Sequence, residues 1–339
     1  MTILTVGIDL AKNVFAVEGR NEKGKVELLR PAVPRAKLLE LIASLPPCLI
    51  GMEACSGAHY WAREFARFGH TVRLMAPKFV APYRRTGRRG KNDAADAAAI
   101  CEAVTRPDML FVPIKTEEQQ QQLMVHRARQ GFIAARTATV NRIRGLLSEF
   151  GIVLPLKADT VRRQATLHLE ELPGLANTVI GDLLSELTHL DERVAQYDGH
   201  IRRLARGKDN PAQRLMRLGG IGETTATAIL AMIGMGHDFK CGRQFAAWLG
   251  LVPSQYSSGG KTRLGRITKA GDAYLRSLLV LGARAVLAAA KNKTDSISTW
   301  ALELEKRRGY WKAVVAIAAK NARMAWAVLA KGEAFKLPA

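Results

Sequence analysis

The chain has 339 residues, of which 48% are hydrophobic, so it is long enough for two domains and apolar enough to fold. It carries 51 Lys and Arg against 30 Asp and Glu, a formal net charge of +21, which points to a polyanionic partner: nucleic acid or an anionic membrane surface. The four cysteines form no CxxC pair and the histidines form no HxxxH pattern, which argues against a zinc site and a disulfide framework.

The positive charge is spread along the chain. Residues 1–114 contain 17 basic and 11 acidic residues, a net of +6, so the remainder carries +15. This distribution favours a broad folded surface that follows a phosphate backbone over a disordered basic tail. The N-terminus lacks the basic region of a signal peptide, and no 18 consecutive residues are apolar, so we expect a cytoplasmic protein with no membrane partner.

The first third of the chain alternates short apolar runs with amphipathic segments. Strands are predicted at 3–8, 14–17, 26–29, 48–52 and 71–75, and helices at 34–45, 58–68 and 92–104. Three strands followed by alternating helices and strands predict a mixed sheet with helices packed on it.

The rest of the chain predicts helices. Residues 117–150 and 175–206 form two long amphipathic stretches, separated by an irregular polar segment at 151–174. This pattern fits a protruding helical hairpin or coiled coil, which often dimerises, and fits an ordinary bundle equally. After Pro211 the pattern is helical except for a Gly-rich loop near 250–272. The expected domains are 1–114, a helical connector at 115–210, and 211–339.

Four acids stand where a metal site could form. Asp9 ends the first predicted strand, Glu53 ends a later strand, and Asp93 and Asp96 share one face of a predicted helix. Each acid alone is also typical of a solvated turn, a helix cap or a surface pair. Together, four carboxylates can hold two Mg²⁺ ions, which stabilise the attacking and leaving oxygens of a phosphoryl transfer.

Three segments around these acids, VGIDLAK at 6–12, GMEAC at 51–55 and KNDAADA at 91–97, resemble the catalytic segments of the DEDD insertion-sequence transposases. The resemblance implies an α/β RNase H-like (RuvC-like) first domain with Asp9, Glu53, Asp93 and Asp96 as catalytic metal ligands for two Mg²⁺, or Mn²⁺, ions. It also implies a prokaryotic, nucleoid-associated enzyme that acts on DNA element ends and a target, with a structured guide RNA, as a homodimer or homotetramer.

A basic loop lies directly before the last acid pair. Residues 83–91 read YRRTGRRGK and contain no acid. Arginine side chains match phosphate geometry, and the two glycines let the backbone approach a ligand, so we expect nucleic-acid contact near the acids, although a solvated loop fits as well. The expected contacts are Arg84, Arg85, Arg88, Arg89 and Lys91.

A second candidate contact is the Gly-rich turn before an apolar helix at 228–233. Its sequence, LGGIGETTA at 218–226, resembles a helix-hairpin-helix, in which the turn and the following helix N-terminus present backbone N–H groups to a DNA phosphate. Gly220 and Gly222 would make that contact. A tight turn between two packed helices is the alternative.

The segment from Phe245 to Asp272 resembles the C-terminal domain of the same transposases, where a serine joins the distant acids in a composite site. The residue before the glycine pair is Ser258, with Ser257 as the alternative and Tyr256 third. A serine needs activation by a base or a metal, and no histidine lies nearby in sequence. A simple connecting turn is the plain alternative. The cations available to neutralise phosphate are Lys261, Arg263, Arg266 and Lys269.

Three other functions fit part of the pattern. The first strand and Asp9 also resemble the first phosphate loop of actin-like ATPases and sugar kinases, but the second Gly-rich phosphate loop of those proteins is missing from the sequence. A Holliday-junction-resolvase-like nuclease without strand transfer would need the acids but not Ser258. A non-enzymatic nucleic-acid-binding protein would need none of the four acids, yet all four are present.

Overall fold

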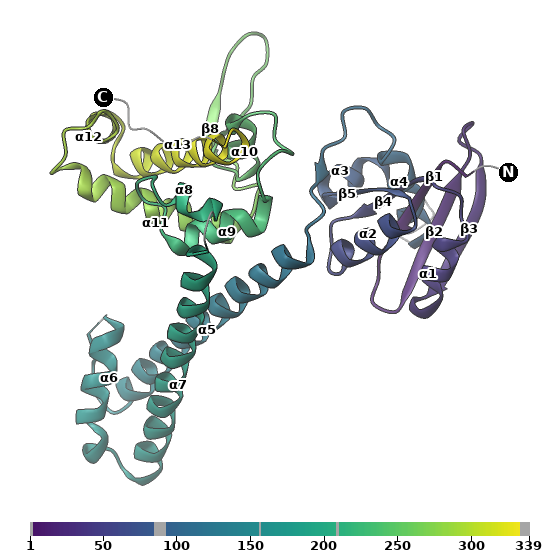
Figure 1. Ribbon diagram of the computed structural model, residues 1–339. Helices are drawn as coiled ribbons and strands as arrows, with labels where there is room; N and C mark the ends of the chain where they lie inside the picture. Colours follow the sequence, from purple (N-terminus) through teal and green to yellow (C-terminus); the bar gives the residue numbers. More distant parts are fainter. Residues whose placement is uncertain (1–2, 85–92, 156, 208–209, 333–339) are drawn as a thin grey trace. The chain divides into compact units, whose positions relative to one another are not determined.

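A computed structural model describes residues 3–84, 93–155, 157–207 and 210–332 (Figure 1). The chain forms two compact units, Met1–Thr116 and Glu117–Ala339. The sequence predicted boundaries after residues 114 and 210. Residues 117–210 lie in the same unit as the C-terminal helices, so their treatment as a separate connector stays a proposal.

The first unit is built on a six-stranded mixed sheet in the order β3-β2-β1-β4-β5-β6. An antiparallel meander of three strands is continued by two strands parallel to β1, and a final short strand runs antiparallel to β5. The mixed sheet predicted from the strand and helix order is present, with one additional strand, β6. The strands are β1 (Thr5–Asp9), β2 (Val14–Arg20), β3 (Val26–Pro34), β4 (Leu49–Glu53), β5 (Thr71–Met75) and β6 (Phe111–Val112).

Helices pack on both faces of this sheet. Leu38 of α1 (Arg35–Ala43) and Phe65 of α2 (Ala58–Arg67) share one apolar core with Ile8 and Met52 of the strands. Because side chains alternate along a strand, Gly7 faces the opposite side. There, α4 (Asp93–Ala103) lies on β1, β2 and β4. Two short helical turns, α3 (Pro77–Val80) and η1 (Ala81–Tyr83), lead toward α4.

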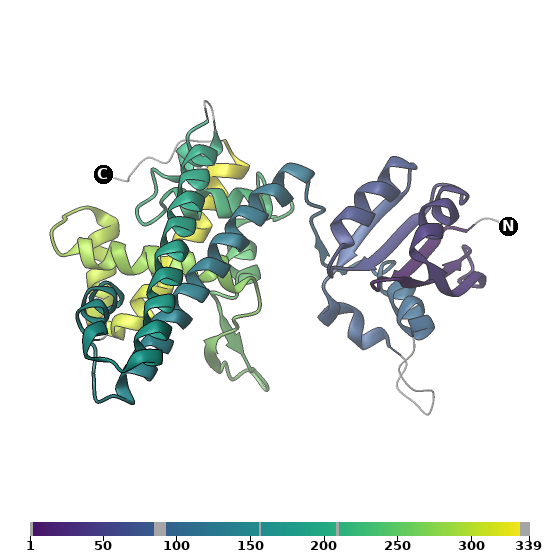
Figure 2. The same cartoon turned by 90° about the horizontal axis from the view of Figure 1, so that it is seen from below.

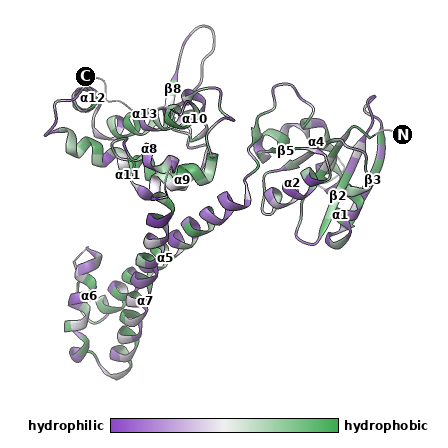
Figure 3. Ribbon diagram, in the orientation of Figure 1, coloured by the Kyte–Doolittle hydropathy of each residue, from purple (hydrophilic) through white to green (hydrophobic). Residues whose placement is uncertain are grey.

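The second unit begins with two long helices, α5 (Glu117–Ser148) and α7 (Gly174–Ala205), which lie side by side along much of their length (Figures 1 and 2). Hydrophilic and hydrophobic residues alternate along both helices (Figure 3). Arg129 Nε lies 2.5 Å from Asp198 Oδ1, and the rings of Phe132 and Tyr197 lie 5.2 Å apart. Apolar and charged contacts therefore both join the pair.

The segment between the long helices is largely helical, whereas the sequence predicted an irregular one. It contains α6 (Ala158–Leu167) and a short turn, η2 (Leu169–Glu171). Val161 and Ala165 of α6 are fully buried in a small core with residues of α5 and α7. The prediction was wrong because the few apolar residues of this segment become a helical stripe only when a partner covers them.

The remaining helices enclose a larger core. Two of them, α11 and α13, are long and apolar enough to span a membrane by length and composition. Leu279 of α11 and Ile317 of α13 are buried in the same core, as expected for core helices of a folded domain. The helices are α8 (Pro211–Leu215), α9 (Glu223–Ile233), α10 (Gly242–Trp248), α11 (Ala273–Ala290), α12 (Ser296–Arg308) and α13 (Tyr310–Ala330).

A two-stranded antiparallel hairpin replaces part of the predicted Gly-rich loop. It pairs β7 (Pro253–Gln255) with β8 (Leu264–Ile267). Its connecting loop extends away from the helices of this unit (Figure 1). Strands of three and four residues with Pro, Ser and Gly show no alternating apolar pattern, so the sequence did not reveal them.

Candidate active site

Asp9 and Glu53 end two neighbouring strands. β1 and β4 are parallel, with Ile8 opposite Met52 and Gly7 opposite Gly51. Asp9 follows Gly7 by two residues and Glu53 follows Gly51 by two, so both acids lie on the face that α4 covers. The alternation of the strands thus brings the two carboxylates to one edge of one face.

The two glycines let α4 lie directly on the sheet. A Cβ atom built on Gly7 would lie 2.3 Å from the carbonyl oxygen of Ala97, and one on Gly51 would lie 2.8 Å from Cβ of Val104. Ala97 directly follows Asp96, which is 6% exposed. Close packing at Gly7 therefore places the first turn of α4, with Asp93 and Asp96, beside the strand end that carries Asp9.

Arg84 joins two of the four acids. Its Nη2 donates a hydrogen bond to Glu53 Oε1 at 3.0 Å, and its Nε lies 2.8 Å from Asp96 Oδ1. The sequence predicted that Arg84 contacts phosphate. In the structure it forms ion pairs with the acids instead, and no spacing rule in the sequence distinguishes this arginine from the others in the same run. Arg85, Arg88, Arg89 and Lys91 lie outside the residues that the structure describes.

The pKa of Asp9 is raised to about 6. Burial is the largest cause, followed by the charges of Asp96, Asp93 and Glu53, while Arg84 acts in the opposite direction. Burial and the three neighbouring acids therefore disfavour ionisation of Asp9, and the charge of Arg84 offsets them only in part. The arrangement concentrates negative charge in a partly buried site.

Cys55 belongs to this cluster, although the sequence suggested no role for it beyond its place in a motif. The pKa of its thiol is raised, first by burial and then by the charges of Asp9 and Glu53. A raised pKa keeps the thiol protonated and reduces its reactivity. The available signal was its position two residues after Glu53, in the turn that leaves β4.

The structure places the candidate serine at the tip of the β7–β8 hairpin. Lys261 N–H donates to the carbonyl oxygen of Ser258 at 3.1 Å, and Gly259 and Gly260 between them have φ of 56° and 76°. Two consecutive positive φ angles are typical of the tight turns that join hairpin strands, and glycine adopts them without strain. Ser258 is exposed, so its hydroxyl is accessible.

The alternative side chains differ in their surroundings. Ser257 Oγ accepts a hydrogen bond from Gln255 Nε2 at 2.8 Å, whereas Tyr256 is 73% exposed. No acid or histidine occurs between Cys241 and Gly271, so the hairpin has no general base of its own. The cations predicted to contact phosphate are exposed along the hairpin and its base: Lys261, Arg263, Arg266 and Lys269.

The base of the hairpin is packed tightly against the preceding helix. A Cβ atom on Gly250 would lie 2.3 Å from the amide nitrogen of Ala270, and one on Gly271 would lie 2.0 Å from the carbonyl oxygen of Trp248. Arg276 Nη1 donates to the carbonyl oxygens of Leu249, at 3.1 Å, and Gly271, at 3.0 Å. The exposed tip therefore extends from a fixed base.

Gly220 and Gly222 have different environments in the turn before α9. Gly220 has φ of 81°, and a Cβ atom there would lie 2.5 Å from the carbonyl oxygen of Gly282 in α11. Gly222 is exposed and lies at the N-cap of α9, and a Cβ atom there would meet nothing within 4 Å. Close packing against α11 thus explains why position 220 is glycine. Gly222 leaves the N-terminus of α9 open to an anion.

Two family models match the chain. A DEDD transposase model of the IS110 group matches residues 6–152, and the model of the transposase IS116/IS110/IS902 family matches residues 212–297. A probable family 20 transposase of Pseudomonas aeruginosa is 45% identical over 345 residues, covering 99% of each chain. The chain belongs to the IS116/IS110/IS902 family of transposases.

Two further relatives support the same family. The transposase for insertion sequence element IS1111A of Coxiella burnetii is 40% identical, covering 98% of this chain and 92% of the relative. The transposase for insertion sequence element IS1328 of Yersinia enterocolitica is 36% identical over 98% of each chain. The predicted resemblance to DEDD insertion-sequence transposases is confirmed, and such transposases are enzymes that cut and rejoin DNA.

The four acids of the candidate site carry carboxylate oxygens. Carboxylate oxygens are the ligands that Mg²⁺ prefers, and a cation beside Asp9 would offset the charges that raise its pKa. In the described part of the chain, no group of three or more His, Cys, Asp or Glu side chains is close enough to hold a metal. Arg84 lies between Glu53 and Asp96, so those two carboxylates are paired with a guanidinium in this arrangement.

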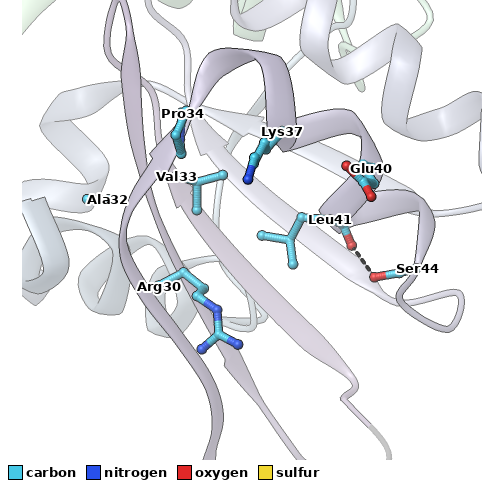
Figure 4. A pocket seen from close by; sticks show the side chains of 8 residues that line it. All are labelled: Arg30, Ala32, Val33, Pro34, Lys37, Glu40, Leu41 and Ser44. Atoms are coloured by element: carbon cyan, nitrogen blue, oxygen red, sulfur yellow. Dashed lines mark hydrogen bonds between the residues drawn. The ribbon is translucent and has the colours of Figure 1, made fainter.

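A pocket in the first unit lies away from these acids. Its volume is about 410 Å³, and it lies between β3 and α1, where Ser44 Oγ donates to the carbonyl oxygen of Leu41 at 2.7 Å (Figure 4). None of the four acids lines it. The pocket and the four acids are therefore separate features of the first unit.

Proposed function

We propose that this transposase cuts and rejoins the DNA of its element ends and a target by phosphoryl transfer. Asp9, Glu53, Asp93 and Asp96 supply the ligands for two Mg²⁺ or Mn²⁺ ions, and Ser258 supplies the nucleophile. The observation that carries the proposal is the convergence of Asp9, Glu53 and the first turn of α4 on one face of the sheet.

The four acids and Arg84 have distinct roles in this proposal. When bound, the divalent ions polarise the phosphate and stabilise the attacking and leaving oxygens. Asp9 and Glu53 hold their positions because each ends a strand whose neighbours fix its register. Arg84 can exchange its carboxylate partners for a DNA or RNA phosphate, because a guanidinium pairs with both.

The serine conserves the energy of the broken phosphodiester. The Oγ atom of Ser258 forms a bond to phosphorus and loses its proton, the bond between phosphorus and the sugar oxygen breaks, and that oxygen takes up a proton. The DNA end stays joined to the protein as a phosphoserine ester until a second sugar hydroxyl attacks and releases the serine. Lys261 and Arg263, exposed near Ser258, would neutralise phosphate charge.

The remaining proposals follow from the family and the charge. The first unit has an RNase H-like, RuvC-like fold, and the turn before α9 acts as a helix-hairpin-helix that contacts DNA through Gly222. The enzyme works in the prokaryotic cytoplasm, associated with the nucleoid, as a dimer or tetramer with a structured guide RNA. The net charge of +21 supports a nucleic-acid partner of this kind.

The test is to trap the covalent intermediate. A reaction with element-end DNA is quenched and digested with protease, and the DNA-linked peptide is identified by mass spectrometry. We expect the adduct on Ser258 and its loss in Ser258→Ala. Ser257→Ala is the matched control and should keep the adduct.

Two outcomes would contradict parts of this proposal. An adduct on Ser257 or Tyr256 would keep the chemistry and change the residue. DNA cleavage without any adduct would show that water is the attacking group, and the enzyme would then act as a resolvase-like nuclease.

A further inference from the structure

An aromatic and basic corner joins α12 to α13. Residues 306–312 read KRRGYWK, with four cations, two aromatic residues and no acid. All six side chains other than glycine are exposed, and Trp311 is 63% exposed. We call this segment, together with Arg284 of α11, the α12–α13 corner (Figure 1). Residues 306–312 lie beyond both segments that the family models match, whereas Arg284 lies within the second of them.

The two rings of the corner are held in place. Arg284 Nε donates a hydrogen bond to the hydroxyl of Tyr310 at 3.2 Å, and its guanidinium carbon lies 5.8 Å from the centroid of the Trp311 ring. The Tyr310 and Trp311 centroids lie 5.1 Å apart at an interplanar angle of 79°. Gly309, with φ of 85°, turns the chain between the helices. A ring fixed by its neighbours loses little conformational freedom when a ligand stacks on it.

The cations of the corner are not paired with acids. In the described part of the chain, no carboxylate lies within ion-pair distance of Arg284, Lys306, Arg307, Arg308 or Lys312. Glu303 and Glu305 lie on the preceding turn of α12 but form no such pair. Cations in the last turn of a helix also stabilise its C-terminus, which explains their position but not a largely exposed tryptophan beside them.

We propose that the α12–α13 corner binds single-stranded nucleic acid, with an unpaired base stacked on Trp311 and the cations on the adjacent phosphates. A duplex turns its bases inward and offers no free base face, so the ring selects single strands. An anionic membrane fits less well, because Ala313, Val314 and Ile317 behind the rings are buried. The corner contains none of the proposed catalytic residues, so this binding is separate from strand cleavage.

The first test measures affinity by fluorescence anisotropy on the full-length protein with labelled 12-nucleotide dT and rU strands and a duplex of equal length. Trp311→Ala should weaken single-strand binding by about 5-fold to 100-fold and duplex binding by less than about twofold. Trp311→Phe should restore most of the single-strand affinity. Phe150→Ala, which removes another exposed ring of the same unit, should change neither affinity.

The second test measures charge and stacking separately. Replacing Lys306, Arg307 and Arg308 with Ala should lower the log–log salt slope for single strands by about 2, since each lost phosphate contact contributes about 0.7. Lys23→Ala/Lys25→Ala, exposed cations of the first unit, should leave the slope unchanged. Oligonucleotide binding should also quench tryptophan fluorescence in the native protein and not in Trp311→Phe.

The outcomes decide the proposal as follows. Tighter binding of dT or of rU identifies the natural strand as DNA or RNA, and either result supports a stacking site. Unchanged single-strand affinity in Trp311→Ala, with a normal circular dichroism spectrum, would overturn it. If Trp311→Ala lost equal affinity for the duplex and for single strands, the proposal would also be overturned, because the corner would then act through charge alone. Ser258→Ala should keep this binding, so failure of the serine chemistry and failure of the corner give different results.

Discussion

Gly7 is the position where a single added carbon should damage both the fold and the candidate site. In Gly7→Ala, the new Cβ atom would lie 2.3 Å from the carbonyl oxygen of Ala97 and 2.4 Å from the amide nitrogen of Cys101. Both neighbours belong to the backbone of α4, so no side-chain rotation relieves the overlap. To restore ordinary contact, α4 must move away from β1 by roughly 1 Å.

The expected cost follows from this overlap. Forcing an extra carbon into a packed core destabilises a protein by about 1–3 kcal/mol, so we expect the free energy of unfolding of the first unit to fall by that amount. The same movement would separate Asp96 from Asp9. Since a misplacement of about 1 Å in an active site can reduce the rate roughly 100-fold, DNA cleavage should fall more than stability alone explains.

The measurement combines urea unfolding, followed by circular dichroism, with hydrogen exchange of peptides from β1 and α4. Exchange should accelerate in these peptides and stay unchanged in α7. Gly131→Ala in α5 is the control, because nothing lies within 4 Å of its added carbon, and it should raise stability by about 0.5–1 kcal/mol. A Gly7→Ala protein with native stability and native exchange in α4 would refute the close packing of α4 on β1.

Three other predictions address stability and chemistry. Burial, and to a lesser extent Arg129, lowers the pKa of His126 to about 4, so the stability that its neutral form supports is complete above pH 6.5 and lost as the pH falls toward 4. Between pH 7 and pH 4.5, the free energy of unfolding measured by urea titration should fall by about 2–3 kcal/mol more in the native protein than in His126→Gln. Equal dependence of this free energy on pH in the two proteins would exclude His126 as the cause. Asp9→Asn should abolish DNA cleavage but keep DNA binding. Removal of divalent ions from the native enzyme with a chelator should have the same effect. Cleavage by Asp9→Asn in Mg²⁺ would disprove the metal role of Asp9. Arg276→Met should lower the free energy of unfolding by about 1.5–3 kcal/mol, because two part-buried carbonyl groups lose a charged hydrogen-bond donor. It should also speed proteolysis of the hairpin. An unchanged protease pattern would contradict this prediction.

The sheet of the first unit could be predicted because each strand is an apolar run with a clear end. Asp9 and Glu53 follow such runs directly, so their positions at strand ends could be inferred from the order of residues alone. Their common face could not, because it depends on the register that sets Gly7 beside Gly51. A shift of one residue would turn one acid to the opposite face.

Local sequence also gave no indication of three tertiary features. Arg84 is one of five cations within nine residues, and only the fold determines that it lies between Glu53 and Asp96. The hairpin around Ser258 has strands too short to show a period. α6 becomes a helix with a buried stripe because α5 and α7 cover Val161 and Ala165. For Arg84 and α6 the deciding interactions are with other segments of the chain, and for the hairpin the strands are too short to show an alternating pattern.

The contact between Gly220 and Gly282 connects the turn before α9 with α11, the helix that follows the serine hairpin. A Cβ atom on Gly282 would lie 1.9 Å from the carbonyl oxygen of Gly220, so the turn before α9 rests on the backbone of α11. The same helix starts at the end of the hairpin base, where Asp272 accepts a hydrogen bond from Leu275 N–H at 2.8 Å. One helix, α11, therefore contacts the turn before α9 near its middle and begins at the base of the serine hairpin, so both elements are built on the same helix.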